Sequence, residues 1–328
     1  MEIPITQSKA WEHLQHDLGE ETFFKKTDDY QFLAILKHTR AGNYLFVPYG
    51  PLSRDQKSSQ KALAALTSLA QSKSVIFIRI EPRSAEMAQI LPPTAKKVHD
   101  INPADTWILD LTADRPTIVK NFTQGTRTCF NNYAKKGIII EKTHDPDEIQ
   151  HLVALQAQVF QNKHLHVYSA KYLKTQLSQP FATLYLAKYH EATDEYRKAA
   201  SDAHSSGEQS VYPAEGQILA AALFFDFNGT RYYMQSASDN AFRRLPATVA
   251  ILGEAIFDAK AAGLKHLDFW GIAPDDAPKS HPWYGFTKFK KSFGGAPLHY
   301  AGTYDIILNP FRYRLFAIAK HLLRAFHH

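Results

Sequence analysis

Lysines and aromatic residues alternate over residues 281–295, soon after a short apolar run that is typical of a strand. The run Asp268-Phe-Trp-Gly-Ile272 ends in Trp-Gly, and the later segment ends in Lys-Phe-Lys-Lys-Ser-Phe-Gly-Gly295. Cations and flat rings at the carboxyl edge of a sheet suit a nucleotide-bearing or carbonyl substrate. A purely structural interpretation also stands, with the lysines in solvent, the phenylalanines in a core and the glycines in a turn.

Four common catalytic motifs are missing from the sequence. It has no Gly-rich phosphate loop ending in Lys-Ser/Thr, no Gly-x-Ser-x-Gly, no His-Glu-x-x-His and no Gly-x-Gly-x-x-Gly after a strand. Their absence disfavours nucleotide hydrolysis, serine hydrolysis, zinc proteolysis and dinucleotide redox chemistry. The single cysteine, Cys129, excludes an intrachain disulfide and a multi-cysteine metal site, so we expect no metal ion or other cofactor.

The composition is that of a globular protein. Of 328 residues, 45% are apolar and 21% are charged, which is ample material for a packed core and suggests about two domains. The 38 Lys and Arg residues exceed the 32 Asp and Glu residues, which permits contact with phosphate or anionic lipid. The amino terminus lacks the layout of a secretory signal and no apolar run is long enough to span a bilayer, so we expect a soluble cytoplasmic protein.

The elements that position this segment repeat one order in both halves of the chain. The first half is predicted to contain helices at 11–18 and 58–72 and strands at 30–38, 43–47 and 75–80. The second half is predicted to contain helices at 116–136, 151–160 and 246–262 and strands at 107–111, 183–188, 218–227, 230–236 and 265–270. Asn228-Gly229 is the strongest hairpin signal. The recurrence predicts an α/β fold of two tandem units.

Five segments, taken together, resemble the FemABX peptidyltransferases in order and spacing. The last of them is Tyr284-Gly-Phe-Thr-Lys-Phe-Lys-Lys-Ser-Phe-Gly-Gly295, preceded by Asp268-Phe-Trp-Gly-Ile272. The other four are Val47-Pro-Tyr-Gly-Pro-Leu52, Ile76-Phe-Ile-Arg-Ile-Glu-Pro82, Trp107-Ile-Leu-Asp-Leu-Thr112 and Thr126-Arg-Thr-Cys-Phe-Asn-Asn-Tyr-Ala-Lys-Lys-Gly137. The resemblance covers most of the chain.

The resemblance implies an activity, a fold and partners. The family moves an amino acid from aminoacyl-tRNA to an amine in the stem peptide of a peptidoglycan precursor, and its fold is two tandem units similar to the GNAT acetyltransferases. The implied domains are 1–104 plus 302–328 on the acceptor side and 105–301 on the aminoacyl-tRNA side. The chain resembles the compact members, because it has no heptad run for a coiled-coil arm.

Two residues of the last motif are implied to act in catalysis. Lys290 occupies the lysine position of the Phe-Lys-x-x-Phe segment, beside Phe289, where its ammonium would stabilise the negative charge on the attacked ester carbonyl. The structural alternative is a surface lysine that lies over Phe293. No residue is singled out as a general base, and Asp268 is expected to support the site through hydrogen bonds. Trp270 is a candidate for substrate contact.

Basic residues elsewhere are candidates for binding the nucleic acid. Arg243 and Arg244 precede a predicted helix whose free N–H groups would help to hold phosphate, although paired arginines are often merely solvated. Arg127 lies on the basic helix, where it is either an RNA contact or part of an ordinary wet face. Tyr233 in the strand at 230–236 is a further candidate. Leu245-Pro246 replaces the glycines that wrap pyrophosphate in acetyltransferases, which weakens a coenzyme A interpretation.

The acceptor side departs from the family pattern at two positions. Compact members carry Trp-x-x-x-Lys near the amino terminus, and here Trp11-Glu-His-Leu-Gln15 places Gln15 at the lysine position. Tyr49 stands where relatives often carry Arg or Lys. We keep Tyr49 as a candidate for substrate contact, although the acceptor pocket is expected to differ from that of relatives.

Two further segments have alternative roles. The residues of 191–216 are polar and rich in Ala, Ser and Glu, which predicts a flexible loop. A terminal helix over 311–326 carries an apolar stripe, Phe311, Leu315, Ile318, Leu322 and Phe326, together with four basic residues. We expect this stripe to pack onto the first domain. The alternative is peripheral contact with the inner, anionic face of the membrane, which would suit a lipid-linked acceptor.

Two other functions compete with aminoacyl transfer. The first is acyl-CoA-dependent N-acyl transfer on the same scaffold, and the second is a catalytically silent module that binds RNA or a membrane. Transfer from aminoacyl-tRNA to a UDP-linked or lipid-linked peptidoglycan precursor, with Lys290 essential, would exclude both.

Overall fold

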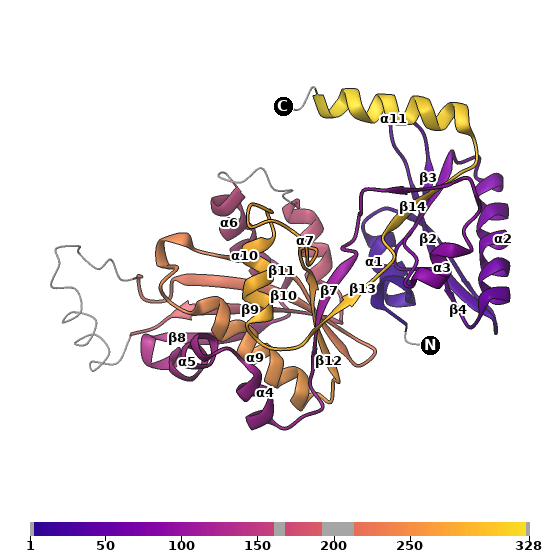
Figure 1. Ribbon diagram of the computed structural model, residues 1–328. Helices are drawn as coiled ribbons and strands as arrows, with labels where there is room; N and C mark the ends of the chain where they lie inside the picture. The colour runs from indigo at the N-terminus through magenta and orange to yellow at the C-terminus, as the bar shows by residue number, and fades with distance from the viewer. Residues whose placement is uncertain (1–2, 161–167, 192–212, 326–328) are drawn as a thin grey trace. The chain divides into compact units, whose positions relative to one another are not determined.

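The computed structural model describes residues 3–160, 168–191 and 213–325 (Figure 1). The chain forms two compact units, which are Met1–Thr106 with Leu298–His328, and Trp107–Pro297. The boundaries expected from the sequence, 104/105 and 301/302, fall close to these divisions. The assignment of an acceptor side and an aminoacyl-tRNA side to them stays a prediction.

Unit 1 is built on a mixed sheet. Its strand order is β1 (Glu21–Lys26), β2 (Tyr30–Lys37), β3 (Tyr44–Val47), β5 (Phe77–Ile80), β14 (Thr303–Ile307) and β6 (Ala95–Val98), and β4 (Leu52–Ser53) pairs with β2. Its helical segments are η1 (Ile5–Gln7), α1 (Lys9–Asp17), α2 (Gln56–Ser72), α3 (Ala85–Gln89) and α11 (Pro310–Ala325). The β3–β5 pair is parallel, whereas β14 is antiparallel to both β5 and β6.

The longest helix of the amino-terminal part, α2, forms because its start is capped and one side is apolar. Asp55 accepts a hydrogen bond from the backbone N–H of Ser58 at 2.7 Å, which satisfies a free donor of the first turn. Ala62, Leu66 and Ala70 recur at helical spacing and are buried in the same core as the strands β2, β3 and β5. This helix therefore covers one face of the sheet.

A buried ion pair holds the returning carboxyl-terminal segment in unit 1. Arg79 of β5 contacts both carboxylate oxygens of Asp305 of β14, with Nε–Oδ1 and Nη2–Oδ2 each 2.7 Å. The Tyr313 hydroxyl of α11 donates to the same carboxylate at 2.8 Å. The pair joins two residues that lie 226 positions apart in the chain. Loss of either partner would leave a buried charge without a counterion, which would destabilise unit 1.

Unit 2 contains a second mixed sheet with helices on both faces. Its strand order is β13 (Ala296–His299), β7 (Asp105–Asp110), β12 (His266–Gly271), β11 (Thr230–Ser238), β10 (Ile218–Phe227), β9 (Ala182–Tyr189) and β8 (Ile138–Thr143). Its helices are α4 (Arg115–Asn121), α5 (Gln124–Asn132), α6 (Ile149–Phe160), α7 (Ala170–Leu177), α9 (Ala247–Ala261) and α10 (Tyr284–Lys291), with short turns η2 (Ala134–Lys136), η3 (Pro146–Glu148) and η4 (Asn240–Phe242). Figure 1 shows α6 and α7 on one side of this sheet and α4, α5 and α9 on the other.

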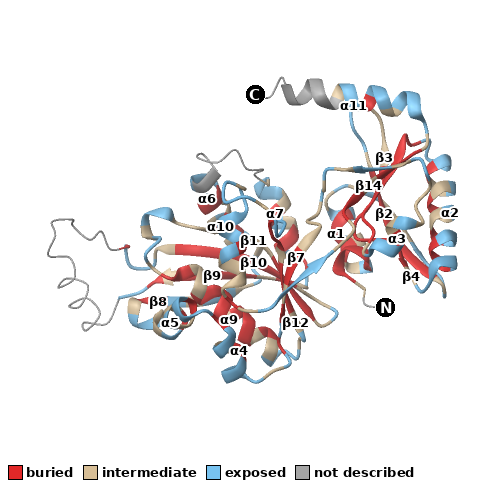
Figure 2. Cartoon of the chain, in the orientation of Figure 1, coloured by how far each residue is buried: buried red, intermediate tan, exposed pale blue. Residues whose placement is uncertain are grey.

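The core of unit 2 lies between its sheet and α9. Figure 2 shows this helix and the central strands largely buried. Along α9 the fully buried residues Ala250, Ile251 and Ala255 keep the helix close to the strands, and Gly253 leaves room for the Phe130 ring of α5. An added Cβ at Gly253 would come within 2.2 Å of that ring, so glycine is required there.

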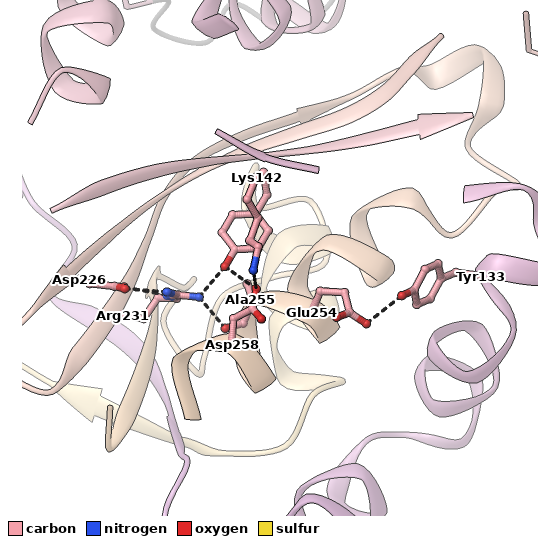
Figure 3. Close-up of polar contacts among 8 residues, drawn as sticks. Tyr133, Lys142, Asp226, Arg231, Glu254, Ala255 and Asp258 are labelled. Carbon is pink, nitrogen blue, oxygen red and sulfur yellow. Dashed lines mark hydrogen bonds and ion pairs between the residues drawn. The ribbon is translucent and has the colours of Figure 1, made fainter. Parts of the chain in front are cut away.

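A polar network lies under α9 (Figure 3). Arg231 contacts both carboxylate oxygens of Asp226 at 2.7 and 2.6 Å, and it donates to the Tyr185 hydroxyl and to the Ala255 carbonyl, each at 2.8 Å. Tyr185 in turn donates to Asp258 at 2.9 Å. Each of these polar groups therefore has a partner, which a buried guanidinium requires. Their position, joining β9, β10 and β11 to α9, indicates a structural role.

The hairpin and α9 form as the sequence predicts. Asn228 and Gly229 have positive φ angles of 48° and 80°, as a two-residue turn between β10 and β11 requires. Helix α9 covers Ala247–Ala261 within the predicted 246–262, and Gly263 follows with φ 78°.

The predicted basic helix over 116–136 is wrong as a single helix. The chain forms α4, leaves helical geometry at Phe122, and restarts as α5 after Thr123. Phe122 is buried against the rings of Phe130 and Phe293, at 6.0 and 5.2 Å, and the Thr123 N–H donates to the Ser292 carbonyl at 2.8 Å. Tertiary packing therefore breaks a segment whose sequence favours one helix.

Two other expectations concern the loop and the membrane. Most of the loop expected at 191–216, namely residues 192–212, lies outside the described residues. Among the helices of the described part of the chain, none has the length and apolar character needed to cross a bilayer.

Candidate active site

The strand β12 has a strained backbone at Trp270, next to its last residue. Trp270 has φ 63°, in the left-handed region that residues with a side chain adopt at a cost. Its N–H donates to the Asp268 carboxylate at 2.7 Å, and Asp268 is buried. The parallel pairing between β11 and β12 includes Tyr232 with Asp268 as its last pair. The strained residue Trp270 therefore lies just beyond the last residue of β12 that pairs with β11.

Two side chains of helix α10 are bonded to the end of β12 and to the residues that follow it. The Lys290 ammonium donates to the Gly271 carbonyl at 2.5 Å, and the Thr287 hydroxyl accepts from the Ala273 N–H at 2.8 Å. Thr287 and Lys290 lie three residues apart, so both face the end of β12. The structure thus places the Lys290 ammonium at the carboxyl end of β12.

The electrostatics of Lys290 differ from those of an ordinary surface lysine. Burial disfavours the charged ammonium and lowers the pKa of Lys290 to about 8, while the nearby Asp268 carboxylate acts in the opposite direction. The Lys290 side chain is half-buried and its ammonium is bonded to a backbone carbonyl, whereas the structural alternative has a surface lysine over Phe293. In the described part of the chain, no group of three or more His, Cys, Asp or Glu side chains is arranged to hold a metal ion.

The other residues of the motif fix the carboxyl end of α10. Phe289 packs edge-to-face on buried Phe293, with ring centroids 5.4 Å apart, and so lies beside Lys290 as an anchor in the core. Gly295 has φ 98°, and an added Cβ there would lie 2.4 Å from the Ile108 carbonyl of β7. The Gly294 carbonyl accepts from the Trp107 ring N–H at 2.7 Å. The Gly-Gly pair therefore permits the backbone to pack closely on β7.

Arg243 and Arg244 follow β11 at the same edge of the sheet as the carboxyl end of β12. They follow β11, whose carboxyl end points in the same direction as that of its parallel neighbour β12. Both arginines are exposed. They precede α9, which begins at Ala247 after Pro246 with no side-chain cap on its first N–H groups. Two positively charged side chains and the N–H donors of the first turn of α9 therefore lie close together in the sequence, at one edge of the sheet.

Arg127 and Tyr233 have bonds within the protein. Arg127 donates to the carbonyls of Lys120 and Phe122, at 3.0 and 3.4 Å, where α4 ends. Tyr233 is buried, its hydroxyl donates to Ser236 at 2.6 Å, and burial raises its pKa to about 12. These contacts describe structural roles for both residues, and their contact with substrate stays a prediction.

Tyr49 lies in unit 1, in a turn with φ 47°. Its ring is buried, and its hydroxyl donates to the Pro103 carbonyl at 2.8 Å. Its N–H donates to Glu81 at 3.4 Å, and Glu81 also accepts from the backbone and side chain of Asn102 at 2.8 and 2.7 Å. Gln15, which stands at the family's lysine position, is buried as well. The turn is therefore well fixed, and the described contacts of Tyr49 lie within its own unit.

Part of the chain matches a known family. A family model described as the FemAB family matches residues 185–321, a stretch that includes β12, α10 and Lys290. The predicted resemblance to the FemABX family is confirmed. The comparison with curated proteins found no match.

Solved structures similar to this chain support the fold. FemX has a TM-score of 0.76 at 16% identity, over 96% of this chain and 94% of FemX. L-PGS from Bacillus licheniformis has a TM-score of 0.56 at 13% identity, over 99% of each chain. A tandem GNAT protein from the clavulanic acid biosynthesis pathway has a TM-score of 0.50 at 11% identity, over 87% of this chain and 82% of that protein. The predicted α/β fold of two tandem GNAT-like domains is confirmed.

Several residues of the quoted motifs form hydrogen bonds or ion pairs that residue type alone does not identify. Thr287 lies inside the quoted FemABX-like motif, yet its bond to Ala273 depends on how the chain returns after β12. Arg79 and Glu81 likewise belong to a motif of unit 1, and both are buried with polar partners. Their position in an otherwise apolar segment was the signal in the sequence that could have identified them, since a buried charged residue needs a partner.

Proposed function

We propose that this protein transfers an amino acid from aminoacyl-tRNA to an amine of a peptidoglycan precursor. The observation that carries the proposal is the Lys290 ammonium, which is half-buried at the carboxyl end of β12 and bonded to the Gly271 carbonyl. The match of residues 185–321 to the FemAB family supports a transferase, because the matched stretch contains this lysine and its helix.

The reaction needs a group that stabilises negative charge. The amine of the acceptor attacks the ester carbonyl of the aminoacyl end, a C–N bond forms, and the carbonyl oxygen gains negative charge. When the carbonyl reforms, the ester C–O bond breaks and the ribose hydroxyl leaves, taking up the proton that the amine loses. A fixed cation such as the Lys290 ammonium lowers the energy of the charged intermediate in a site with little water.

Lys290 can perform this role while it keeps its bond to Gly271. In the present arrangement its ammonium bonds to a neutral carbonyl, that of Gly271. An oxyanion is a stronger acceptor than a neutral carbonyl, so the bound intermediate would draw a hydrogen bond from the same ammonium without movement of the backbone. An ammonium has three donors, and one of them can remain on Gly271.

The tRNA end has suitable partners on unit 2. Arg243, Arg244 and the uncapped start of α9 are suited to phosphate groups of the terminal nucleotides. The exposed rings of Trp283, Tyr284 and Phe286 at the start of α10 are suited to stacking on bases. We assign the acceptor to unit 1, which carries Tyr49.

A second candidate function is N-acyl transfer from acyl-CoA. The structural similarity to a tandem GNAT protein is the reason to consider this second function. Against it, Leu245 and Pro246 stand before α9, and Pro246 has no N–H to offer to a pyrophosphate.

The experiment compares donors with the purified full chain. Radiolabelled aminoacyl-tRNA and acetyl-CoA are each supplied with the UDP-linked and the lipid-linked precursor, and the label in the stem peptide is measured. We expect transfer from aminoacyl-tRNA that ribonuclease treatment of the donor abolishes. Transfer from acyl-CoA alone would contradict the proposal and support the second candidate.

A further inference from the structure

The first turns of helix α11, residues 310–319, pack on the rest of unit 1 through Tyr313 and Phe316. Phe316 is buried and contacts the Phe77 ring of β5 at a centroid distance of 5.0 Å. Tyr313 contacts the same ring at 5.2 Å and bonds to Asp305. These two residues lie three positions apart and so define the attached face of the helix.

The opposite side of α11 is apolar and exposed. Phe311, Leu315 and Ile318 are 72%, 51% and 57% exposed. At about 100° per residue these three lie within roughly 60° of one another, on the side of the helix away from Phe316. Figure 2 shows the described part of α11 largely exposed. The prediction that the apolar stripe packs onto the first domain is therefore wrong for these residues, because Tyr313 and Phe316 occupy the attached face instead.

Exposed arginines border this stripe on both sides. Arg312 and Arg314 are exposed, and helical geometry places one on each flank of the line formed by Phe311, Leu315 and Ile318. From residue 306 to the end of the sequence there is no Asp or Glu, and the chain adds Lys320 and Arg324. The acidic residue that precedes this stretch, Asp305, is buried and paired with Arg79.

We propose that this face of α11, formed by Phe311, Leu315 and Ile318 with Arg312 and Arg314, docks on an anionic lipid surface. A helix that lies in the interface buries an apolar stripe among acyl chains while flanking arginines reach the phosphates. A second copy of the chain fits this face less well, because a symmetric contact would bring four arginines together without an acidic partner from the same segment. The docking is weak and reversible, because the face defined here buries only three apolar side chains.

The surface is independent of the proposed transfer reaction. It lies in unit 1 and includes no residue of the site on β12 and α10. A failure of lipid binding therefore leaves the transfer assay with a UDP-linked precursor unaffected, and a failure of that assay leaves lipid binding untouched.

The experiment measures binding of the full chain to vesicles by flotation. One set of vesicles is pure phosphatidylcholine, and the other contains phosphatidylglycerol as well. We expect binding only to the anionic set, decreasing as salt is raised. The variant Arg312→Gln/Arg314→Gln should bind roughly 30-fold more weakly. The variant Phe311→Ser/Leu315→Ser/Ile318→Ser should lose binding altogether.

Matched controls separate the helix from general charge. Lys265→Gln/Lys279→Gln removes two exposed lysines from unit 2 and should change vesicle binding by less than about twofold. Circular dichroism establishes that each variant is folded. Short-chain, water-soluble phosphatidylglycerol should not displace the protein, because the proposal concerns a surface and not a headgroup pocket.

Three results would overturn the proposal. They are equal binding to neutral and anionic vesicles, unchanged binding of folded α11 variants, and a dimer in light scattering that the Leu315→Glu substitution dissociates. The last result would assign the stripe to a second copy of the chain.

Discussion

At the scale of single residues, the site depends on one half-buried cation and one buried carboxylate. Burial lowers the pKa of Lys290 to about 8, and Asp268 raises it against that effect. Asp268 also holds the Trp270 backbone through its N–H, in a conformation that costs free energy. Backbone strain of this kind persists where neighbouring bonds hold the residue in place. Here the strained residue directly precedes Gly271, whose carbonyl accepts the hydrogen bond from Lys290.

The rate of transfer should depend on pH through Lys290. The reaction needs the protonated form, which is present below the pKa and lost above it. The single-turnover rate should therefore fall as pH rises through about 8. In Asp268→Asn the neighbouring negative charge is gone while an oxygen remains for the Trp270 N–H, so this fall should move to lower pH by roughly one unit.

The matched control for that prediction is Asp275→Asn. Asp275 is exposed and lies 3.3 Å from Lys291, a neighbour of Lys290 on the same helix. Its removal should leave the pH profile unchanged. A profile that is flat between pH 7 and 9 in the unsubstituted protein would show that the protonation of Lys290 does not limit the reaction.

At the scale of elements, the site is the junction of β12, α10 and β7. The two glycines after α10 have positive φ angles, and the chain at Gly295 passes directly against the backbone of β7. Thr123 and Thr126, near the start of α5, are bonded to Ser292, the residue that directly follows α10. The carboxyl end of α10, which carries Lys290, is therefore held from two sides.

A methyl group at Gly295 should disturb this junction. Gly295→Ala adds a Cβ that would lie 2.4 Å from the Ile108 carbonyl, in a conformation that alanine adopts at a cost. We expect a loss of about 2–4 kcal/mol in the free energy of unfolding, measured by urea denaturation. The control is Gly285→Ala in α10, where nothing lies within 4 Å of an added Cβ, and which should stabilise by about 0.5–1 kcal/mol. Equal effects of the two substitutions would refute this explanation.

Substitution of Arg231 in the polar network under α9 should destabilise the protein as much as breaking a buried ion pair does. Arg231→Met leaves Asp226 without its cation and Tyr185 without a donor, so we expect a loss of about 3–5 kcal/mol in stability. Lys142→Met removes an exposed partner of Asp258 and should cost less than about 1 kcal/mol. Thermal unfolding of both variants measures the difference, and a small effect for Arg231→Met would mean that water replaces its bonds.

The sequence predicts elements well where local signals are strong. Asn228-Gly229 requires a hairpin by its own conformational preferences, and Gly263 ends α9 for the same reason. The break at Phe122 was not predictable, because the reason for it is the contact with Phe293, a residue distant in the sequence. Strand β14 was missed as well, since its partners β5 and β6 lie more than 200 residues earlier.

The candidate site was predictable only in part, because motifs identify residues and do not identify their partners in the fold. The resemblance identified Lys290 and Phe289, and the structure places them on one helix at the end of β12. The internal bonds of Arg127 and Tyr233 were not predictable, because basic and aromatic residues look alike whether they bind substrate or a neighbouring helix. Residue type carries no information about which carbonyl or hydroxyl lies nearby.

At the scale of the whole molecule, the chain leaves unit 1, forms unit 2 and returns to complete the first sheet. Strand β14 takes its place between β5 and β6, and the Arg79–Asp305 pair lies at that junction. The returning segment then ends in α11, whose attached face also meets Asp305 through Tyr313. The sheet of unit 1 therefore forms fully only when β14, which follows unit 2 in the chain, is in place.

Removing the carboxylate of that pair should open unit 1 selectively. Asp305→Ala leaves the Arg79 guanidinium buried without its partner, and we expect a loss of about 3–5 kcal/mol. Hydrogen exchange followed by mass spectrometry should show faster exchange in β3, β5 and β6 and unchanged exchange in β9, β10 and β11. Uniform loss of protection in both sheets would indicate that the two units unfold as one.

The central claim concerns the ammonium of residue 290, and single-turnover transfer with Lys290→Met tests it most directly. The reaction uses saturating aminoacyl-tRNA and precursor, with Lys288→Met, an exposed lysine on the same helix, as the matched control. We expect Lys290→Met to be slower by about 100-fold or more, with donor affinity nearly unchanged, and Lys288→Met to be within about threefold of the unsubstituted protein. Equal rates for the two variants would contradict the proposed role of Lys290.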